Sequence, residues 1–107
     1  MTDKIKAELP TQEELAWAKI VGETAKIEWK QLQTFFASGH VLTVAAELDL
    51  VEVAYDFSND NAENLKPLIE KELIAAASDQ QALEWYEKDA IMWSCVVRPW
   101  VLVQEVT

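Results

Sequence analysis

The C-terminal stretch 100–106 restricts the fold of this chain more than any other segment. Its residues alternate as those of a β-strand do, and large apolar side chains fall on both faces: Trp100, Leu102 and Val106 on one, Val101 and Val103 on the other. Burying each of them contributes roughly 1.5 to 3 kcal/mol, whereas a whole domain is stable by only about 5 to 15 kcal/mol. We therefore predict a structural strand, which is central or lies under a helix if both faces are covered. With one bare face it would be an edge strand that a second copy can pair with.

The whole chain has the size and composition of one domain. It has 107 residues, of which half are apolar, and its two glycines leave no flexible linker. The first nine residues are mostly polar and precede Pro10. We expect a flexible tail over residues 1–9 and a single domain over residues 10–107.

Helix signals dominate the first third of that domain. Thr11 and Glu14 are spaced as a capping box, which predicts a helix to about Glu23. Its inward side is expected to carry Leu15, Ala18, Val21 and Gly22, with Trp17 and Ile20 beside them. Residues 25–29 then alternate charged and apolar side chains. A helix is predicted over residues 30–38, with Gly39 as its C-terminal stop, and a strand over residues 41–44.

The segment 48–57 fits two periodicities. Its apolar positions repeat both as those of a strand and as those of a helix, so periodicity leaves both structures open. Asp49 and Glu52 lie where the N-terminus of a helix favours negative charge, which makes the helix the preferred interpretation.

Two more helices are predicted beyond this segment. The first covers residues 61–73, with Pro67 kinking it or confining it to the residues after the proline. The second begins at a capping box formed by Ser78 and Gln81 and runs through Lys88. The inward side chains are expected to be Leu65, Leu68, Ile69 and Leu73 in the first, and Leu83 with Trp85 or Tyr86 in the second.

Short apolar runs complete the predicted secondary structure. Residues 73–77 form a short strand, and the break at Arg98–Pro99 separates residues 91–97 from the terminal strand. The predicted fold class is α+β: a helix-rich single domain with a small, mainly antiparallel sheet of short strands, similar in shape to a winged helix. That similarity of shape implies nothing about DNA binding.

The charge of the chain points away from nucleic acids. Nineteen acidic residues against nine basic ones give a net charge of -10, whereas binding to phosphates needs clustered Lys and Arg. No basic residue occurs between Lys30 and Lys66, where six acidic residues fall: Glu47, Asp49, Glu52, Asp56, Asp60 and Glu63. This acidic region is either a solvated face that keeps the protein soluble or a docking surface for a basic partner.

The sequence contains no recognisable catalytic or cofactor motif. Two glycines cannot form a phosphate-binding loop, and His40 and Cys95 are the only histidine and the only cysteine. The stretch 56–67 has the spacing of a calcium loop at its start but lacks the required glycine and the final glutamate, so a helix cap is the preferred interpretation. We assign no catalytic, cofactor-binding or metal-binding residue and expect no cofactor.

The five tryptophans support two interpretations. Trp85, Trp93 and Trp100 cluster in the sequence around Arg98, the only arginine, either as core residues or as a partly exposed patch for a partner. Together with the acidic residues they define the candidate interaction surface: Glu47, Asp49, Glu52, Asp56, Asp60, Trp93, Arg98 and Trp100.

The cysteine count and the hydropathy pattern suggest a location. One cysteine allows no intramolecular disulfide, no apolar segment follows the N-terminal residues, and the longest apolar run is far shorter than a membrane span. We expect a cytoplasmic protein, monomeric or homodimeric, that binds neither membranes nor nucleic acids.

Several strings are similar to those of a known family: Gly22-Glu-Thr-Ala25, Ile27-x-Trp29, Phe35-Phe-Ala-x-Gly39, Leu48-Asp-Leu-Val-Glu-Val-Ala54 and Pro99-Trp-Val-Leu-Val-Gln-Glu105. On these strings the chain resembles the bacterial domain-of-unknown-function family numbered 2288. The stretch Ala45-Ala-Glu47 departs from the acidic residue and proline expected there in relatives. The resemblance implies a bacterial cytosolic protein of unknown role, with no activity or site residues to carry over.

Two functions are consistent with these observations. The preferred hypothesis is a binding or regulatory module that acts through protein contacts with an unknown, basic partner. The alternative is a small enzyme that uses carboxylates in an aromatic-lined pocket. A deep pocket in which Asp or Glu converge beside Trp would favour the enzyme, and an open acidic or aromatic face would favour the module.

Overall fold

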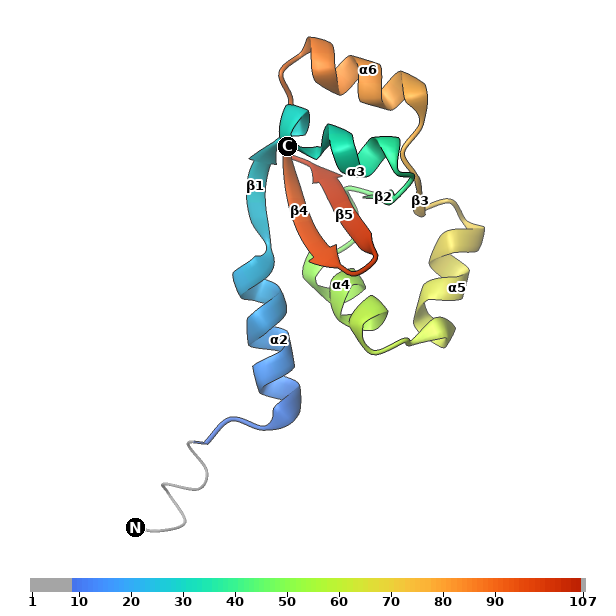
Figure 1. Ribbon diagram of the computed structural model, residues 1–107. Helices are drawn as coiled ribbons and strands as arrows, with labels where there is room; N and C mark the ends of the chain where they lie inside the picture. The colour runs from blue at the N-terminus through green and yellow to red at the C-terminus, as the bar shows by residue number, and fades with distance from the viewer. Residues whose placement is uncertain (1–8, 107) are drawn as a thin grey trace.

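Strand β5 (Trp100–Glu105) lies at the centre of a five-stranded sheet in the computed structural model, which describes residues 9–106 (Figure 1). The strand order is β1-β4-β5-β2-β3. In chain order the elements are α2 (Gln12–Glu23), β1 (Ala25–Glu28), the 3-10 helix η1 (Trp29–Leu32), α3 (Gln33–Ala37), β2 (Val41–Val44), α4 (Leu50–Ser58), α5 (Ala62–Glu70), β3 (Ile74–Ala76), α6 (Asp79–Glu87), β4 (Ile91–Val97) and β5.

The sheet is mainly antiparallel, as predicted. Strands β4 and β5 form a hairpin in which Cys95 lies opposite Leu102, and the chain turns between them at the cis Arg98–Pro99 bond. On its other side β5 pairs in parallel with β2, where Leu102 lies opposite Leu42. Strands β1 and β3 form the two edges, each antiparallel to its neighbour.

Both faces of β5 are covered, which explains its central position. Val101, Leu102 and Val103 are 2%, 0% and 0% exposed. Leu102 belongs to the apolar cluster beneath α2, α4 and α5, whereas Val101 and Val103 belong to the cluster beneath η1 and α6. The sequence left open whether one face is bare; both are covered, and β5 is a central strand and not an edge. Val106, which was expected inside, lies beyond the end of β5 and is 37% exposed.

The end of β5 also holds one loop and one helix in place through its side chains. The Gln104 amide Nε2 donates to the carbonyl oxygens of Ala45 and Leu48, both at 2.8 Å, and so fixes the loop between β2 and α4. The Trp85 indole donates to the Glu105 carboxylate at 2.7 Å and ties α6 to the same strand. The family-like string Pro99-Trp-Val-Leu-Val-Gln-Glu105 therefore contains residues that organise the fold.

Helix ends follow the predicted caps. The Thr11 hydroxyl accepts from the Glu14 N–H at 3.0 Å, and Ser78 and Gln81 form a complete capping box. Gly39 ends the helical segment with φ of 77°, a conformation that glycine adopts without strain. The Asp49 carboxylate accepts from the Val51 N–H at 2.9 Å, so the ambiguous segment is helix α4, as preferred.

Helix α2 presents a different face to the domain than the sequence predicts. Leu15 and Val21 are 54% and 49% exposed, and Ala18 and Gly22 are exposed too. Ile20 is the buried residue instead, and Trp17 packs edge-on against Tyr55 of α4 at 5.3 Å. The prediction was wrong because α2 runs along one side of the domain, where α4 and the end of β4 contact only a narrow stripe of it (Figure 1).

Two later helices also bury fewer residues than expected. Leu83 and Ile69 are 57% and 50% exposed, whereas Ala82, Trp85 and Leu65 are buried. Helix α5 continues through Pro67, so of the two expected effects the restriction to the residues after the proline does not occur. The amide hydrogen that Pro67 lacks would have bonded the carbonyl of Glu63, which lies in the exposed first turn, where water can reach it.

The winged-helix comparison fails at the first two helices. Residues 25–28 pair with β4 as an edge strand, so β1 and η1 separate α2 from α3. The expected small, mainly antiparallel sheet has five strands, with helices on both of its faces. Except for Leu9, the tail predicted over residues 1–9 lies outside the described residues.

The buried position of Leu102 leads to a first prediction. The change Leu102→Ala should lower the free energy of unfolding by about 2 to 5 kcal/mol, because it opens a cavity in the central strand. Val106→Ala, at a position 37% exposed, is the control and should change stability by only about 0.5 kcal/mol or less. Chemical denaturation followed by circular dichroism measures both, and equal losses would contradict the central role of β5.

The two hydrogen bonds of Gln104 lead to a second prediction. Gln104→Glu should cost about 1 to 3 kcal/mol at neutral pH, because a carboxylate would face two carbonyl oxygens without a proton to donate. Facing two carbonyl oxygens raises the pKa of the new carboxyl above its ordinary value. The loss should therefore shrink as the pH falls toward about 4, because the protonated carboxyl can donate to one of the carbonyls. Gln80→Glu on the exposed face of α6 is the control, and a pH-independent loss at position 104 would contradict this account.

Candidate functional site

The predicted acidic surface follows helix α4. Asp49, Glu52 and Asp56 are spaced three and four residues apart, which places them on one side of the helix, and Asp60 follows just beyond its end. Asp49, Glu52 and Asp60 are exposed and Asp56 is half-buried, while Glu47 is exposed in the loop before α4. The acidic residues therefore form a stripe rather than a pocket.

Some of these carboxylates have structural partners. Asp49 caps α4, as described above. The Asp56 carboxylate accepts from the side-chain amides of Asn61 and Asn64 at 3.5 and 3.2 Å and so links α4 to the start of α5. The stretch 56–67 therefore joins two helices. The Asn61 side chain does not cap α5, so the helix-cap interpretation is wrong at this residue. Within residues 9–106 no three His, Cys, Asp or Glu side chains are placed to hold a metal ion.

The tryptophans do not gather around Arg98. Trp85 is buried against Trp29 at a centroid distance of 4.8 Å, Trp93 lies beneath the Lys26 amine at 5.1 Å, and Trp100 lies 6.1 Å from His40. Trp93 and Trp100 are at opposite ends of the β4–β5 hairpin, opposite Gln104 and Val97 respectively. Of the two interpretations, Trp85 is a core residue, and Trp93 and Trp100 are half-buried side chains that pack against the core. Trp93 and Trp100 do not meet, because they lie far apart along the hairpin.

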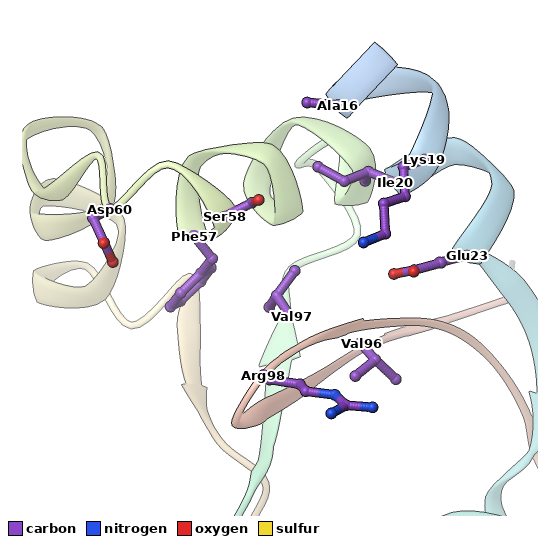
Figure 2. A pocket seen from close by; sticks show the side chains of 10 residues that line it. All are labelled: Ala16, Lys19, Ile20, Glu23, Phe57, Ser58, Asp60, Val96, Val97 and Arg98. Atoms are coloured by element: carbon purple, nitrogen blue, oxygen red, sulfur yellow. The ribbon is translucent and has the colours of Figure 1, made fainter. Parts of the chain in front are cut away.

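The structure instead brings Arg98 toward Asp60. Both line an open cleft of about 990 Å³ between α2, the end of α4 and the β4–β5 turn (Figure 2). Helix α2 adds Lys19 and Glu23 to its wall, and the apolar residues that line it include Ile20, Phe57 and Val97. Figure 2 shows Lys19 and Glu23 reaching from α2 on the side of the cleft away from Asp60. This cleft is the candidate functional site.

Two cations and two anions surround the cleft. Among the described residues the one ion pair joins Lys30 to Asp89, which raises the pKa of the Lys30 amine and lies outside the cleft. Lys19, Glu23, Asp60 and Arg98 therefore keep their charges available to an incoming molecule. Sequence reasoning missed Lys19 and Glu23, because only the packing of α2 beside the hairpin places them there.

A second, smaller hollow joins two other predicted residues. Asp49 and Trp93 line a space of about 260 Å³ together with Leu48 and Gln104. Of the predicted surface, Asp60 and Arg98 therefore meet in one place, and Asp49 and Trp93 meet in another. Glu47, Glu52, Asp56 and Trp100 line neither hollow.

His40 and Cys95 have unrelated surroundings. His40 contacts Trp100 at the start of β5, whereas the Cys95 thiol lies within 3.9 Å of the Ile20 carbonyl oxygen under α2. Cys95 is fully buried, and this burial raises the pKa of its thiol. The thiol is thus a packing group of the core and not an activated nucleophile.

A comparison with protein families agrees with the resemblance noted from the sequence strings. Residues 16–105 match the family model described as Protein of unknown function (DUF2288). The chain belongs to this family. The resemblance noted from the sequence strings is thereby confirmed, and it covers both the cleft and the whole sheet.

A solved structure supports the fold of this DUF2288 chain. It is similar, with a TM-score of 0.77 and 38% identity, to the NMR solution structure of PA1075 from Pseudomonas aeruginosa. The similarity covers 94% of this chain and 93% of that one. No curated protein matches the sequence. Over the described residues, no helix is both long and apolar enough to cross a membrane.

The burial of Cys95 leads to a third prediction. Iodoacetamide at about pH 8 should modify the native protein far more slowly than the denatured one, because both burial and the raised pKa suppress the thiolate. Mass spectrometry of the intact protein over time measures the reaction. Fast labelling of a chain that circular dichroism shows to be folded would contradict the position of Cys95 beneath α2.

Proposed function

We propose that this DUF2288 protein is a small protein-binding module whose docking site is the cleft between α2, α4 and the β4–β5 turn. The observation that carries the proposal is the composition of that cleft: apolar residues from three elements, surrounded by Lys19, Glu23, Asp60 and Arg98. Protein interfaces share this arrangement of an apolar centre within a polar rim.

The charges of the chain suggest the chemistry of the partner. The exposed carboxylates of Asp49, Glu52 and Asp60 follow α4 toward the cleft, and the whole chain carries a net charge of -10. A segment with an apolar anchor and flanking Lys or Arg would match both features. A nucleic acid would instead meet a surface that repels its phosphates.

The single cysteine supports a proposal for the cellular location. A single buried thiol is suited to a reducing compartment. We therefore place the module in the cytoplasm, where its acidic surface would meet a basic protein partner.

The enzyme alternative has less support. It calls for carboxylates that converge beside tryptophan in a deep pocket, but the large cleft is open and is lined by no tryptophan. Its two carboxylates, Glu23 and Asp60, belong to different elements and share the rim with Lys19 and Arg98. This arrangement favours recognition of a protein surface over acid–base chemistry.

Photocrosslinking from the cleft tests the proposal as a fourth prediction. A photoreactive phenylalanine analogue replaces Lys19 at the cleft, and in a control protein it replaces Lys88 on the other side of the sheet. In living cells the cleft position should give a discrete protein adduct that the control position does not give. The adduct is detected as a mobility shift and identified by mass spectrometry.

A matched pair of charge changes gives that experiment its specificity. Glu23→Lys and Glu87→Lys each change the net charge from -10 to -8, and each replaces the last residue of a helix, α2 and α6 respectively. Only Glu23→Lys, inside the cleft, should weaken the adduct. The proposal is wrong if position 19 gives no adduct, if both positions give the same adducts, or if Glu23→Lys leaves the adduct unchanged in a folded protein.

A further inference from the structure

Strand β1 is a sheet edge with an alternating charge pattern. It pairs with β4 on one side and is the first strand in the order of the sheet, so within residues 9–106 no strand lies on its other side. Lys26 and Glu28 are exposed on this edge, on either side of Ile27. Edge strands are templates for pairing unless charges or short length protect them.

The backbone of β1 determines which groups are free to pair. The Trp29 N–H points toward β4, because it donates to the carbonyl of Ala90, while the Ala90 N–H donates to the Trp85 carbonyl. Backbone N–H directions alternate along a strand, so Ile27 and Ala25 also turn their backbone groups toward β4. The N–H and C=O groups of Lys26 and Glu28 therefore point away from the sheet.

We infer that β1 pairs antiparallel with β1 of a second copy, with Ile27 opposite Ile27 across a twofold axis. In this register Lys26 of each copy lies opposite Glu28 of the other, and both residues have the outward backbone groups that the ladder needs. Two cross-strand pairs of opposite charge result, and four backbone hydrogen bonds form.

The charge pattern selects this register over its neighbours. A shift by two residues places either Lys26 opposite Lys26 or Glu28 opposite Glu28, and like charges directly opposite are destabilising. Shifts of the register by an odd number of residues are excluded. They would place residues whose N–H and C=O groups point outward opposite residues whose groups point toward β4. Like charges at positions 26 and 28 would have opposed pairing with a second copy. With Lys at 26 and Glu at 28, each residue instead lies opposite a residue of the other sign.

Exposed apolar residues at both ends of β1 extend this interface. Val21, in the last turn of α2 before β1, is 49% exposed, and Ile91, opposite Glu28 on β4, is 50% exposed. Antiparallel pairing brings the start of β1 in one copy beside its end in the other. The last turn of α2 then approaches the half-exposed Ile91 of the second copy and can cover part of both side chains. None of these residues lines the large cleft, so this dimer is independent of the function proposed for it.

Charge exchange tests the pairing in the full-length protein. Analytical ultracentrifugation at 0.15 M ionic strength, where screening shortens the repulsion between two acidic chains to about 8 Å, should show a concentration-dependent dimer. Lys26→Glu alone and Glu28→Lys alone each place like charges opposite one another in the dimer, and each should raise the dissociation constant by about tenfold or more. The double variant Lys26→Glu/Glu28→Lys restores opposite pairs and should dimerise nearly as the natural sequence does.

Mixing the two single variants gives the decisive measurement. One carries Glu at both positions and the other carries Lys at both, so together they form two opposite pairs and should dimerise with each other more tightly than either does with itself. Hydrogen exchange at the amides of Lys26 and Glu28 should slow on dimerisation. The inference is wrong if the natural protein stays monomeric at millimolar concentration, if the single variants dimerise as well as it does, or if the mixture shows no preference.

Discussion

The burial of β5 on both faces is the constraint on which the rest of the structure depends. Val101 and Val103 need a cover on one side and Leu102 needs one on the other, so helices are required on both faces of the sheet. Hydrogen bonds from Gln104 and Trp85 then attach the β2–α4 loop and α6 to the same strand. The position of α4, and with it one wall of the candidate cleft, follows from this strand.

The candidate surfaces lie where this core ends. Helix α2 contacts the domain by a narrow stripe, which leaves room beside the hairpin for a cleft and leaves Leu15 and Val21 bare. The free edge of β1 follows directly from α2 in the chain. A chain of this length cannot cover every apolar group, and the exposed ones are spread over several helices and over β4. The proposals for partners therefore rest on the charges that surround the cleft and on the charge pattern of β1.

Much of the fold was predictable from the sequence because it rests on local chemistry. Caps at Thr11 and Ser78, the stop at Gly39 and the alternation of the last strand depend on residues a few positions apart, and all were placed correctly. Even for the ambiguous segment 48–57 the helix was preferred on a local feature, the negative charges of Asp49 and Glu52 at its start, and the structure shows that Asp49 caps it. Membership of the family followed from strings that mostly serve these structural roles.

Which side chains of a helix face the core or the cleft was decided only by the tertiary structure. Periodicity identified an apolar side of α2 but could not tell that α4 would contact Ile20 and Trp17 instead. Likewise Asp60 and Arg98 were singled out separately, whereas Lys19 and Glu23 join them only because α2 lies beside the hairpin. The sequence by itself determined most of the elements and the apolar character of both faces of the last strand, since these depend on local propensity and on side-chain area. Whether both faces would be covered was left open. Contacts between distant elements depend on how the helices distribute over two faces of a sheet, and no spacing within the chain encodes that choice.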